Sequence, residues 1–167
     1  HYFQRCGSTN VEARRLAGMT SSPAGTLVVA DVQEAGRGRL GREWSSEFGE
    51  NLLFSLVMGP RVVPQMAPVC VLAWAAAMAE VLDCQVKWPN DLITSDGYKI
   101  GGILAELSAE AERVCFVVLG GGINVNQREF PGLPEAKSMA NIRGENLDRA
   151  QLLADLVSAI EAVDTRS

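Results

Sequence analysis

The sequence predicts an α+β domain in which a mixed β-sheet packs against helices. Short apolar and β-branched runs of strand length recur along the chain. Longer segments have helical composition or periodicity, and strands and helices do not alternate strictly, as they would in a parallel βαβ fold. The 167 residues suffice for one domain with a sizeable core, and we expect the helices to lie on one side of the sheet.

Seven segments have the length and composition of strands, and Gly, Pro, Asn or Asp residues bound most of them. Two of these segments flank the tight turn at residues 95–97, which predicts a hairpin. The glycines at residues 120–122 are expected to interrupt the last strand. The predicted strands cover residues 2–5, 26–32, 51–58, 85–87, 91–94, 98–107 and 113–124.

Three segments are predicted to be helical. Thr9 and Glu12 have the spacing of a capping box at the start of a short helix. Residues 66–82 are rich in alanine and apolar around most of the circumference, which predicts a central buried helix. A last amphipathic helix is expected to be capped by Asp148 and Gln151. Its apolar face consists of Leu153, Leu156, Val157, Ile160 and Val163.

The composition argues against several classes of protein. With 15 basic and 20 acidic side chains the net charge is -5, whereas nucleic-acid binders usually carry a basic excess. The longest strictly apolar run, residues 69–79, is too short to span a bilayer. The sole histidine, His1, stands at the terminus, so a histidine-based catalytic triad is not expected. We therefore predict neither a nucleic-acid partner nor a membrane partner.

The cysteines are far apart and form no CxxC pair, which argues against a metal site and against a disulfide framework. A reducing cytoplasm is the simplest setting for such a chain. The four cysteines are Cys6, Cys70, Cys84 and Cys115.

Residues 33–46 combine three glycines with three arginines and have neither a strand period nor a helix period. No Gly-Lys-Ser/Thr follows the glycines, and Gly41 opens no recognisable helix, so neither a Walker A loop nor a dinucleotide fingerprint is present. Arg37, Arg39 and Arg42 can each present several donors to a phosphate, and Trp44 adds an aromatic face. We interpret the segment as a mobile cationic loop that folds over an anion, with a solvated surface loop as the equally weighted alternative.

Three further segments combine polar side chains with glycine or proline. Residues 87–91, Lys-Trp-Pro-Asn-Asp, place Asn90 and Asp91 at a strand edge, where they either meet a ligand or only shape a turn. Lys99 precedes two glycines that would let a ligand approach the strand, although it could also be an ordinary strand-end lysine. Asn124 follows the glycines at residues 120–122 and could bond a ligand or simply end a strand. The chemistry predicted from these residues is electrostatic, as suits nucleotidyl transfer.

Taken together and in order, these segments resemble the biotin protein ligases, and the resemblance covers nearly the whole chain. The segments that carry it are Ser8-Thr9-Asn10, Gly36-Arg37-Gly38-Arg39 running to Gly41-Arg42 and Trp44, Lys87-Trp88-Pro89-Asn90-Asp91, Lys99 with Gly101-Gly102-Ile103-Leu104, and Gly122-Ile123-Asn124-Val125-Asn126. The resemblance implies the mixed-sheet fold shared by biotin ligases and class II aminoacyl-tRNA synthetases. It also implies a catalytic domain over residues 1–167, expected without the N-terminal DNA-binding domain or the C-terminal SH3-like barrel of some relatives.

The resemblance further implies a role for each matching residue. The expected catalytic residues are Arg37, Arg39, Lys99 and Asp91. The expected biotin-binding residues are Ser8, Thr9, Asn10, Gln33, Gly36, Arg37, Arg39, Lys99, Gly101 and Gly102, with Gly122 giving the ligand room. The expected nucleotide-binding residues are Arg39, Arg42, Trp44, Asn90 and Asn124. No metal motif is present, and Mg²⁺ is expected near Asp91.

The activity implied is that of an ATP-dependent ligase that forms biotinyl-5′-AMP and transfers biotin to a lysine. ATP with Mg²⁺ and biotin are the expected substrates, and the acceptor is the biotin carboxyl carrier domain of a biotin-dependent carboxylase. A homodimer is a further expectation. The alternatives are a non-catalytic protein that binds biotin or biotinyl-AMP, and a related lipoate or octanoate transferase. The arginine loop followed by Trp44 favours biotin.

Overall fold

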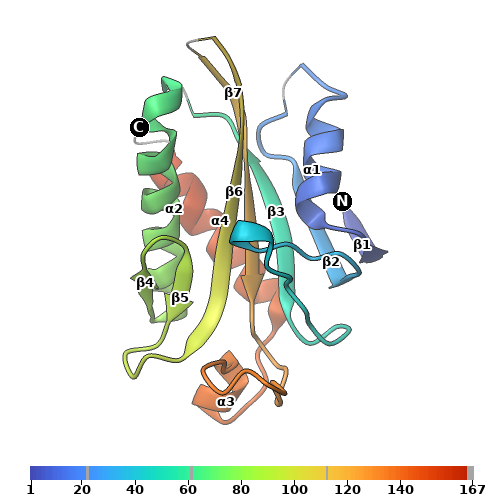
Figure 1. Cartoon of the computed structure of the whole chain (residues 1–167), viewed down its shortest axis with the longest axis vertical. Coiled ribbons are helices and arrows are strands. Elements are labelled where there is room, and N and C mark those ends of the chain that lie inside the picture. The colour runs from blue at the N-terminus through green and yellow to red at the C-terminus, as the bar shows by residue number, and fades with distance from the viewer. Residues whose placement is uncertain (22, 61, 112, 165–167) are drawn as a thin grey trace.

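A seven-stranded mixed sheet forms the centre of the computed structural model, which describes residues 1–21, 23–60, 62–111 and 113–164 (Figure 1). The spatial order is β1-β2-β3-β7-β6-β5-β4, with β1 and β2 parallel and the other neighbours antiparallel. The predicted α+β class with a mixed sheet is confirmed. The strands are β1 (Tyr2–Cys6), β2 (Leu27–Gln33), β3 (Leu52–Met58), β4 (Gln85–Lys87), β5 (Asp91–Ile93), β6 (Lys99–Glu110) and β7 (Arg113–Ile123).

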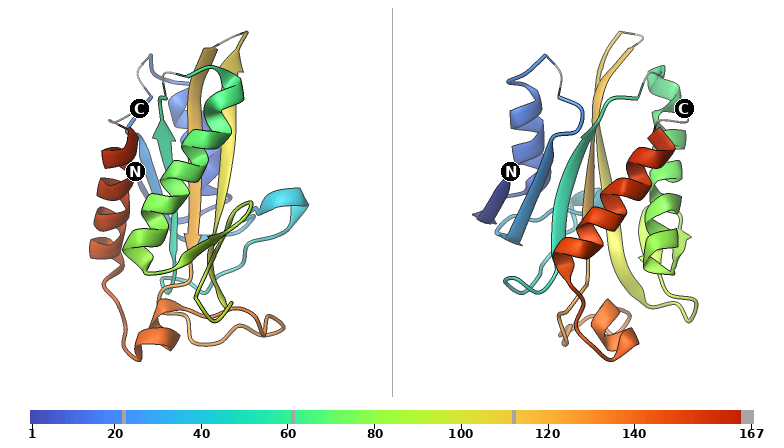
Figure 2. Two further views of the ribbon diagram at one scale, coloured as in Figure 1. Left: turned by 90° about the vertical axis from the view of Figure 1, so that its left-hand side faces the viewer. Right: turned by 180° about the vertical axis from the view of Figure 1, so that it is seen from behind.

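Helices cover both faces of the sheet, so the prediction that they lie on one side is wrong. Helix α1 packs on β2, β3 and β7, whereas α2 and α4 pack together on the opposite face (Figure 2). The parallel β1–β2 pair explains the difference, because the connection between parallel strands must cross one face of the sheet. The helices are α1 (Thr9–Ala17), α2 (Ala67–Leu82), α3 (Met139–Arg143) and α4 (Arg149–Asp164), with short 3₁₀ turns η1 (Arg39–Gly41) and η2 (Pro64–Met66).

Strand β3 lies in the interior of the fold, and each of its seven residues is buried. Phe54 and Leu56 point into the large apolar core beneath α2 and α4, whereas Val57 points into a smaller cluster beneath α1. Successive strand residues face opposite sides of a sheet, so this strand divides its side chains between two environments. Ser55 is the polar exception on the α1 face.

Two of the predicted helix caps differ from the structure. Ser8, not Thr9, is the N-cap of α1, and Glu12 pairs with Arg15 instead of closing a capping box. The Thr9 backbone N–H donates to Gln33 Oε1, at 2.7 Å, so a side chain from β2 replaces the local cap. At α4, the Asp148 carboxylate accepts bonds from the backbone as predicted, whereas the Gln151 side chain donates to Asp155 instead. The short helix α3, which begins with a Ser138–Asn141 capping box, was not predicted.

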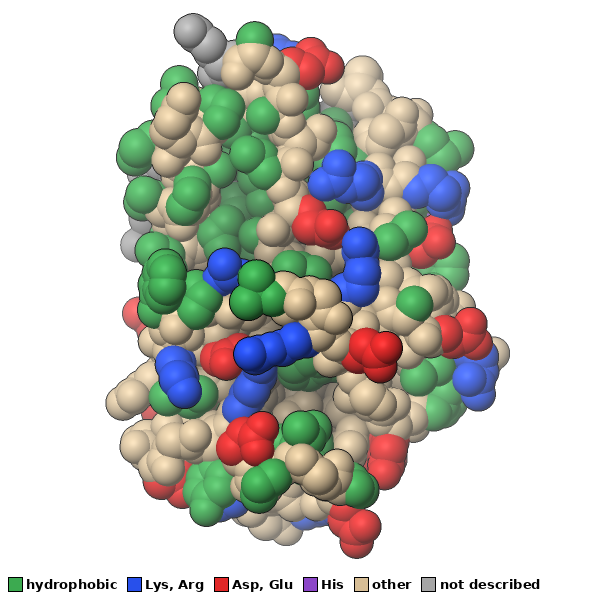
Figure 3. Space-filling model, in the orientation of Figure 1, with side chains coloured by type: hydrophobic (Ala, Val, Ile, Leu, Met, Phe, Trp, Pro, Cys, Tyr) green, Lys and Arg blue, Asp and Glu red, His purple; other side chains and the backbone are tan. Residues whose placement is uncertain are grey.

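Helix α2 is not buried on all sides, contrary to the prediction for residues 66–82. Trp74 and Met78 lie in the core, but Val69 and Leu72 are exposed. Figure 3 shows hydrophobic side chains gathered over α2 at the surface. By length and composition alone, Pro64–Leu82 could cross a membrane, which is weak evidence because the core helix of a water-soluble protein passes the same test.

The glycines at residues 120–122 lie within β7 and do not interrupt it, contrary to the prediction. They pair on one side with β3 and on the other with β6. The predicted hairpin around residues 95–97 is present, with Thr94 N–H donating to the Tyr98 carbonyl at 2.8 Å. The glycine run therefore marks a place where the sheet surface lacks side chains, not a place where the strand ends.

Candidate functional site

A cavity of about 420 Å³ opens on the face of the sheet that carries α1. Elements distant in sequence meet there, namely the start of α1, the end of β2, the arginine loop, β5, β6 and the end of β7. It brings together most of the predicted site residues. The predicted residues that line it are Ser8, Thr9, Asn10, Gln33, Arg37, Arg39, Arg42, Trp44, Asn90, Asp91, Lys99, Gly102 and Gly122.

Glycines form part of the cavity floor. Gly122 of β7 lies in register with Gly102 of β6, and Gly120 lies two residues away on the same face. A Cβ at Gly122 would lie 2.7 Å from Trp44 Cε2, and a Cβ at Gly120 would overlap the Asn10 amide. The missing side chains therefore create the depression in which Trp44 and Asn10 lie against the sheet.

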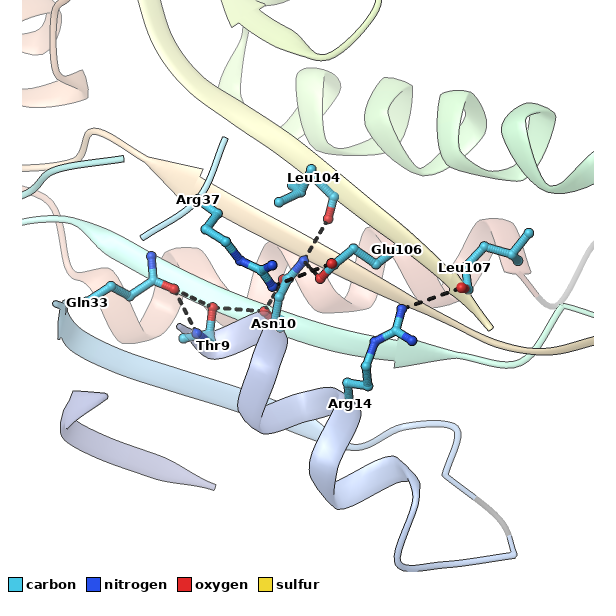
Figure 4. Close-up of polar contacts among 9 residues, drawn as sticks. Thr9, Asn10, Arg14, Gln33, Arg37, Leu104, Glu106 and Leu107 are labelled. Carbon is cyan, nitrogen blue, oxygen red and sulfur yellow. Dashed lines mark hydrogen bonds and ion pairs between the residues drawn. The ribbon is translucent and has the colours of Figure 1, made fainter. Parts of the chain in front are cut away.

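One end of the cavity is a polar cluster of Thr9, Asn10, Gln33 and Ser55, in which all but Gln33 are buried. Figure 4 shows Thr9, Asn10 and Gln33. Thr9 Oγ1 lies 3.0 Å from Gln33 Oε1, and Ser55 Oγ lies 2.8 Å from Thr9 Oγ1 and 2.6 Å from Asn10 Oδ1. The two hydroxyl groups have two protons to serve these three oxygen–oxygen contacts. Two protons cannot serve all three contacts, so at least one of these oxygens is left to accept a hydrogen bond from a ligand.

Lys99 forms the other end of the cavity. Its Nζ lies 2.7 Å from Asp91 Oδ1 and 5.8 Å from the centre of the Trp44 ring. The backbone of Lys99 is held as well, because its N–H donates to Glu135 O and its carbonyl accepts from Lys137 N–H. A cation held by both its backbone and its side chain is pre-positioned for a negatively charged ligand.

The arginine loop crosses the cavity between these two ends. Trp44 N–H donates to Gly36 O and Gly38 N–H donates to Arg42 O, so the loop folds back on itself. The three arginines of the loop all line the cavity, and Lys and Arg side chains lie across the middle of this face (Figure 3). The loop and Lys99 together make this region of the cavity electropositive.

Trp44 packs on the sheet over the glycines. Its indole nitrogen is buried and, among the described residues, has no hydrogen-bond partner. An unpaired buried donor costs roughly 1–3 kcal/mol, which a ligand acceptor could offset. Trp44 therefore lies where it can contact a bound ligand, beside Lys99.

Three predicted site residues do not line the cavity. A Cβ at Gly36 would overlap the Trp44 carbonyl, so this glycine permits the loop to close on itself. A Cβ at Gly101 would meet Gly122 O and Ile123 Cδ1, so it packs between strands. The Asn124 amide donates to Lys137 O, which ties it to the segment that holds Lys99.

No metal centre is formed by the part of the chain that the structure describes, where no three His, Cys, Asp or Glu side chains gather suitably. Asp91, the residue predicted to lie near Mg²⁺, is paired with Lys99. A single carboxylate is compatible with Mg²⁺ that arrives on nucleotide phosphates, because that ion takes few protein ligands.

Sequence reasoning missed two polar residues that contact Asn10 at the polar end of the cavity. Ser55 is the only polar residue in the apolar strand Leu52–Met58, and that isolation could have revealed it. Glu106 lies on β6 and accepts a hydrogen bond from Asn10 Nδ2 at 2.8 Å. It is two and four positions beyond Leu104 and Gly102, so the two-residue strand period places all three on the cavity face.

Comparison with known proteins identifies the family to which the chain belongs. Residues 2–124 match the biotin/lipoate A/B protein ligase family, so the chain belongs to that family. The bifunctional ligase/repressor BirA of Bacillus spizizenii is 39% identical over 170 residues, covering 96% of this chain and 52% of that protein. The biotin–[acetyl-CoA-carboxylase] ligase of Mycobacterium tuberculosis is 34% identical, covering 93% of this chain and 60% of that protein.

Solved structures agree with the family assignment. The biotin protein ligase of Aquifex aeolicus in complex with biotin and ATP superimposes with a TM-score of 0.77 at 33% identity, covering 99% of this chain and 70% of that one. The Leishmania major ligase in complex with biotinyl-5-AMP gives 0.78 at 25% identity, covering 99% and 74%. The chain spans about half the length of the BirA relatives that it matches.

Proposed function

We propose that this chain is the catalytic domain of an ATP-dependent biotin protein ligase. It forms biotinyl-5′-AMP and transfers biotin to a lysine of a biotin carboxyl carrier domain. The observation that carries the proposal is the polarity of one cavity, which is rich in acceptors at one end and cationic at the other. Biotin has the matching polarity, with a cyclic urea at one end and a carboxylate at the other.

The acceptor-rich end favours biotin over lipoate or octanoate. Thr9, Ser55, Asn10 and Gln33 present four oxygens around two hydroxyl protons. The urea ring of biotin brings two N–H donors to such a cluster, whereas the dithiolane ring of lipoate and the alkyl chain of octanoate bring none. A buried acceptor without a donor is unfavourable, so this end selects a ligand that donates hydrogen bonds.

The cationic end suits the carboxylate and phosphate of the reaction. We propose that Lys99, Arg37 and Arg39 stabilise the charge on the oxygens of the reacting groups, and that Arg42 approaches the phosphates. Trp44 and Asn90 would lie near the nucleotide. Gly102 and Gly122 leave room for Trp44 on the sheet, and we propose that they also let the ligand approach beside it.

The proposed reaction has two steps. A carboxylate oxygen of biotin attacks the α-phosphorus of MgATP, the bond between the α-phosphorus and the bridging oxygen breaks, and pyrophosphate leaves. The neutral amine of the acceptor lysine then attacks the acyl carbon, the bond to the phosphate oxygen breaks, AMP leaves and the amine loses a proton. We propose that Lys99 Nζ, which pairs with Asp91, acts in both steps, since charge develops on neighbouring oxygens each time.

The same proposal includes a carboxylase carrier domain as the acceptor and the cytoplasm as the compartment. Relatives named biotin–[acetyl-CoA-carboxylase] ligase support a carboxylase carrier domain as acceptor. The four free cysteines are compatible with a reducing cytoplasm. Asn124 would act through the Lys137 segment near the nucleotide.

Calorimetry and adenylate formation test the proposal. We expect biotin to bind in preference to lipoate and octanoate, and MgATP with biotin to yield biotinyl-AMP and pyrophosphate. Tight biotin binding without pyrophosphate release would support the non-catalytic binder instead. Preferential binding of lipoate would move the chain to the lipoate branch of its family, and no binding of either ligand would overturn the proposal.

A further inference from the structure

Glu106 links the polar end of the cavity to the arginine loop, although no sequence motif includes it. It lies on the cavity face of β6, and its side chain is 24% exposed. Its two carboxylate oxygens contact different elements. Oε2 accepts from Asn10 of α1, and Oε1 pairs with Arg37 of the arginine loop (Figure 4).

The contact with Asn10 fixes the orientation of a buried amide. Asn10 is 4% exposed, and its Nδ2 donates to Glu106 Oε2 at 2.8 Å and to Leu104 O at 3.2 Å. Both partners can only accept, so the amide nitrogen must face them and Oδ1 must face Ser55. Glu106 thereby helps to keep Oδ1 within the acceptor-rich cluster.

The contact with Arg37 ties the loop to the sheet. Arg37 Nη2 lies 3.4 Å from Glu106 Oε1, and the Arg37 side chain is half exposed. Ion pairs as exposed as this one are weak, so one partner can be replaced by another anion. A ligand carboxylate or phosphate could therefore replace Glu106 as the partner of Arg37.

We propose that Glu106 is a positioning residue that couples the urea-binding end of the cavity to the arginine loop. Its carboxylate fixes the Asn10 amide throughout the reaction and holds Arg37 only until a ligand anion takes its place. This role rests on the proposed function for the identity of the ligand. The tether between Glu106 and Arg37 in the free protein does not depend on that identity.

Hydrogen exchange and calorimetry on Glu106→Gln test the coupling. We expect faster exchange over residues 36–43 in the free protein, because the ion pair is lost, and equal exchange once biotinyl-AMP is bound. The Kd for biotin should rise about tenfold, because a glutamine amide can rotate and no longer forces the Asn10 orientation. A change that only loosened the fold would speed exchange throughout the chain and in both states.

Glu110→Gln is the matched control, since Glu110 lies on the same strand and is exposed. It should leave loop exchange and biotin affinity unchanged. If the Glu106→Gln protein fails to fold, Glu106→Asp is the second variant for the same test. It should loosen the loop, because the shorter side chain reaches less far toward Arg37.

A reciprocal change separates the Asn10 contact from the loop contact. Asn10→Asp places two carboxylates together and should weaken biotin binding. Adding Glu106→Gln to this variant restores a hydrogen bond, because the new glutamine amide can donate to the new aspartate carboxylate. The double variant should therefore recover part of the affinity for biotin.

Three results bear on the inference in different ways. Unchanged loop exchange in the free Glu106→Gln protein, or a Kd within twofold of wild type, would overturn the coupling. Absence of recovery in the double variant would remove the Asn10 part of it. Failure of the wild-type protein to bind biotin would instead count against the proposed function. Hydrogen exchange of the loop in the free protein would still show whether Glu106 holds Arg37.

Discussion

The two faces of the central sheet have opposite chemistry, although alternate residues of the same strands form them. Phe54 and Leu56 contribute to an apolar core under α2 and α4. Ser55, between them, belongs to the polar cluster of the cavity. Because side chains alternate along a strand, one strand can contribute to stability on one face and to ligand binding on the other. The lesson is that a substitution here should affect either folding or binding, according to the face on which it falls.

The largest expected effect is on the cavity face. Lys99→Ala removes the cation that lies 2.7 Å from Asp91 and borders the cavity. We expect the rate of biotinyl-AMP formation to fall about 100-fold or more, with little change in the thermal unfolding temperature. Pyrophosphate release measures the rate. A rate close to wild type would remove Lys99 from the reaction.

The corresponding change on the core face should affect stability alone. Leu156 of α4 is fully buried in the apolar cluster. Leu156→Ala should lower the free energy of unfolding by about 2–5 kcal/mol, through lost burial and a residual cavity. Urea titration measures this loss, and calorimetry on the folded variant should give a biotin Kd near that of wild type. A large change in Kd would show that the two faces are not independent.

The neighbouring glycines Gly121 and Gly122 allow the sharpest comparison. A Cβ at Gly121 would overlap the Phe54 ring in the core, whereas a Cβ at Gly122 would lie 2.7 Å from Trp44 in the cavity. Gly121→Ala should cost about 1–3 kcal/mol of stability through overpacking. Gly122→Ala should instead shift Trp44 fluorescence and weaken biotin binding, with a smaller loss of stability. Equal losses of stability in the two variants would contradict the division of the sheet into a core face and a cavity face.

The prediction that involves no change in stability or binding concerns a thiol on the core face. Burial, with a lesser contribution from Asp83, raises the pKa of Cys84 to about 11, so little thiolate is present near neutral pH. At pH 8, iodoacetamide should modify Cys84 roughly 100-fold more slowly than a free thiol, and the rate should rise as the pH approaches the pKa. Peptide mass spectrometry measures the extent of modification, with the denatured protein as control. Modification of Cys84 as fast as a free thiol would show that this part of the core is open.

The sequence predicted most of the fold because local patterns specify most of its elements. Strand composition located all seven strands, and the turn at residues 95–97 located the hairpin. The placement of helices on two faces depends on strand order, which local patterns do not contain. The Thr9 cap was predicted wrongly because its true partner, Gln33, is supplied by a different strand.

The site was predicted where its residues occur in contiguous motifs and missed where they do not. Lys99 and Asp91 belong to motifs and meet in the structure. Glu106 belongs to none, and its importance depends on contacts with Asn10 and Arg37, which are 96 and 69 positions away in the chain. Long-range partners of this kind become visible only once the strands are in register.

Transfer of biotin to a carrier tests the central claim most directly. The protein is mixed with biotin, MgATP and a purified biotin carboxyl carrier domain, and intact-mass spectrometry follows the carrier. We expect the carrier to gain one biotinyl group, and a carrier whose acceptor lysine is replaced by arginine to gain none. A carrier of unchanged mass, while the protein binds biotin and ATP remains available, would contradict the assignment as a biotin protein ligase.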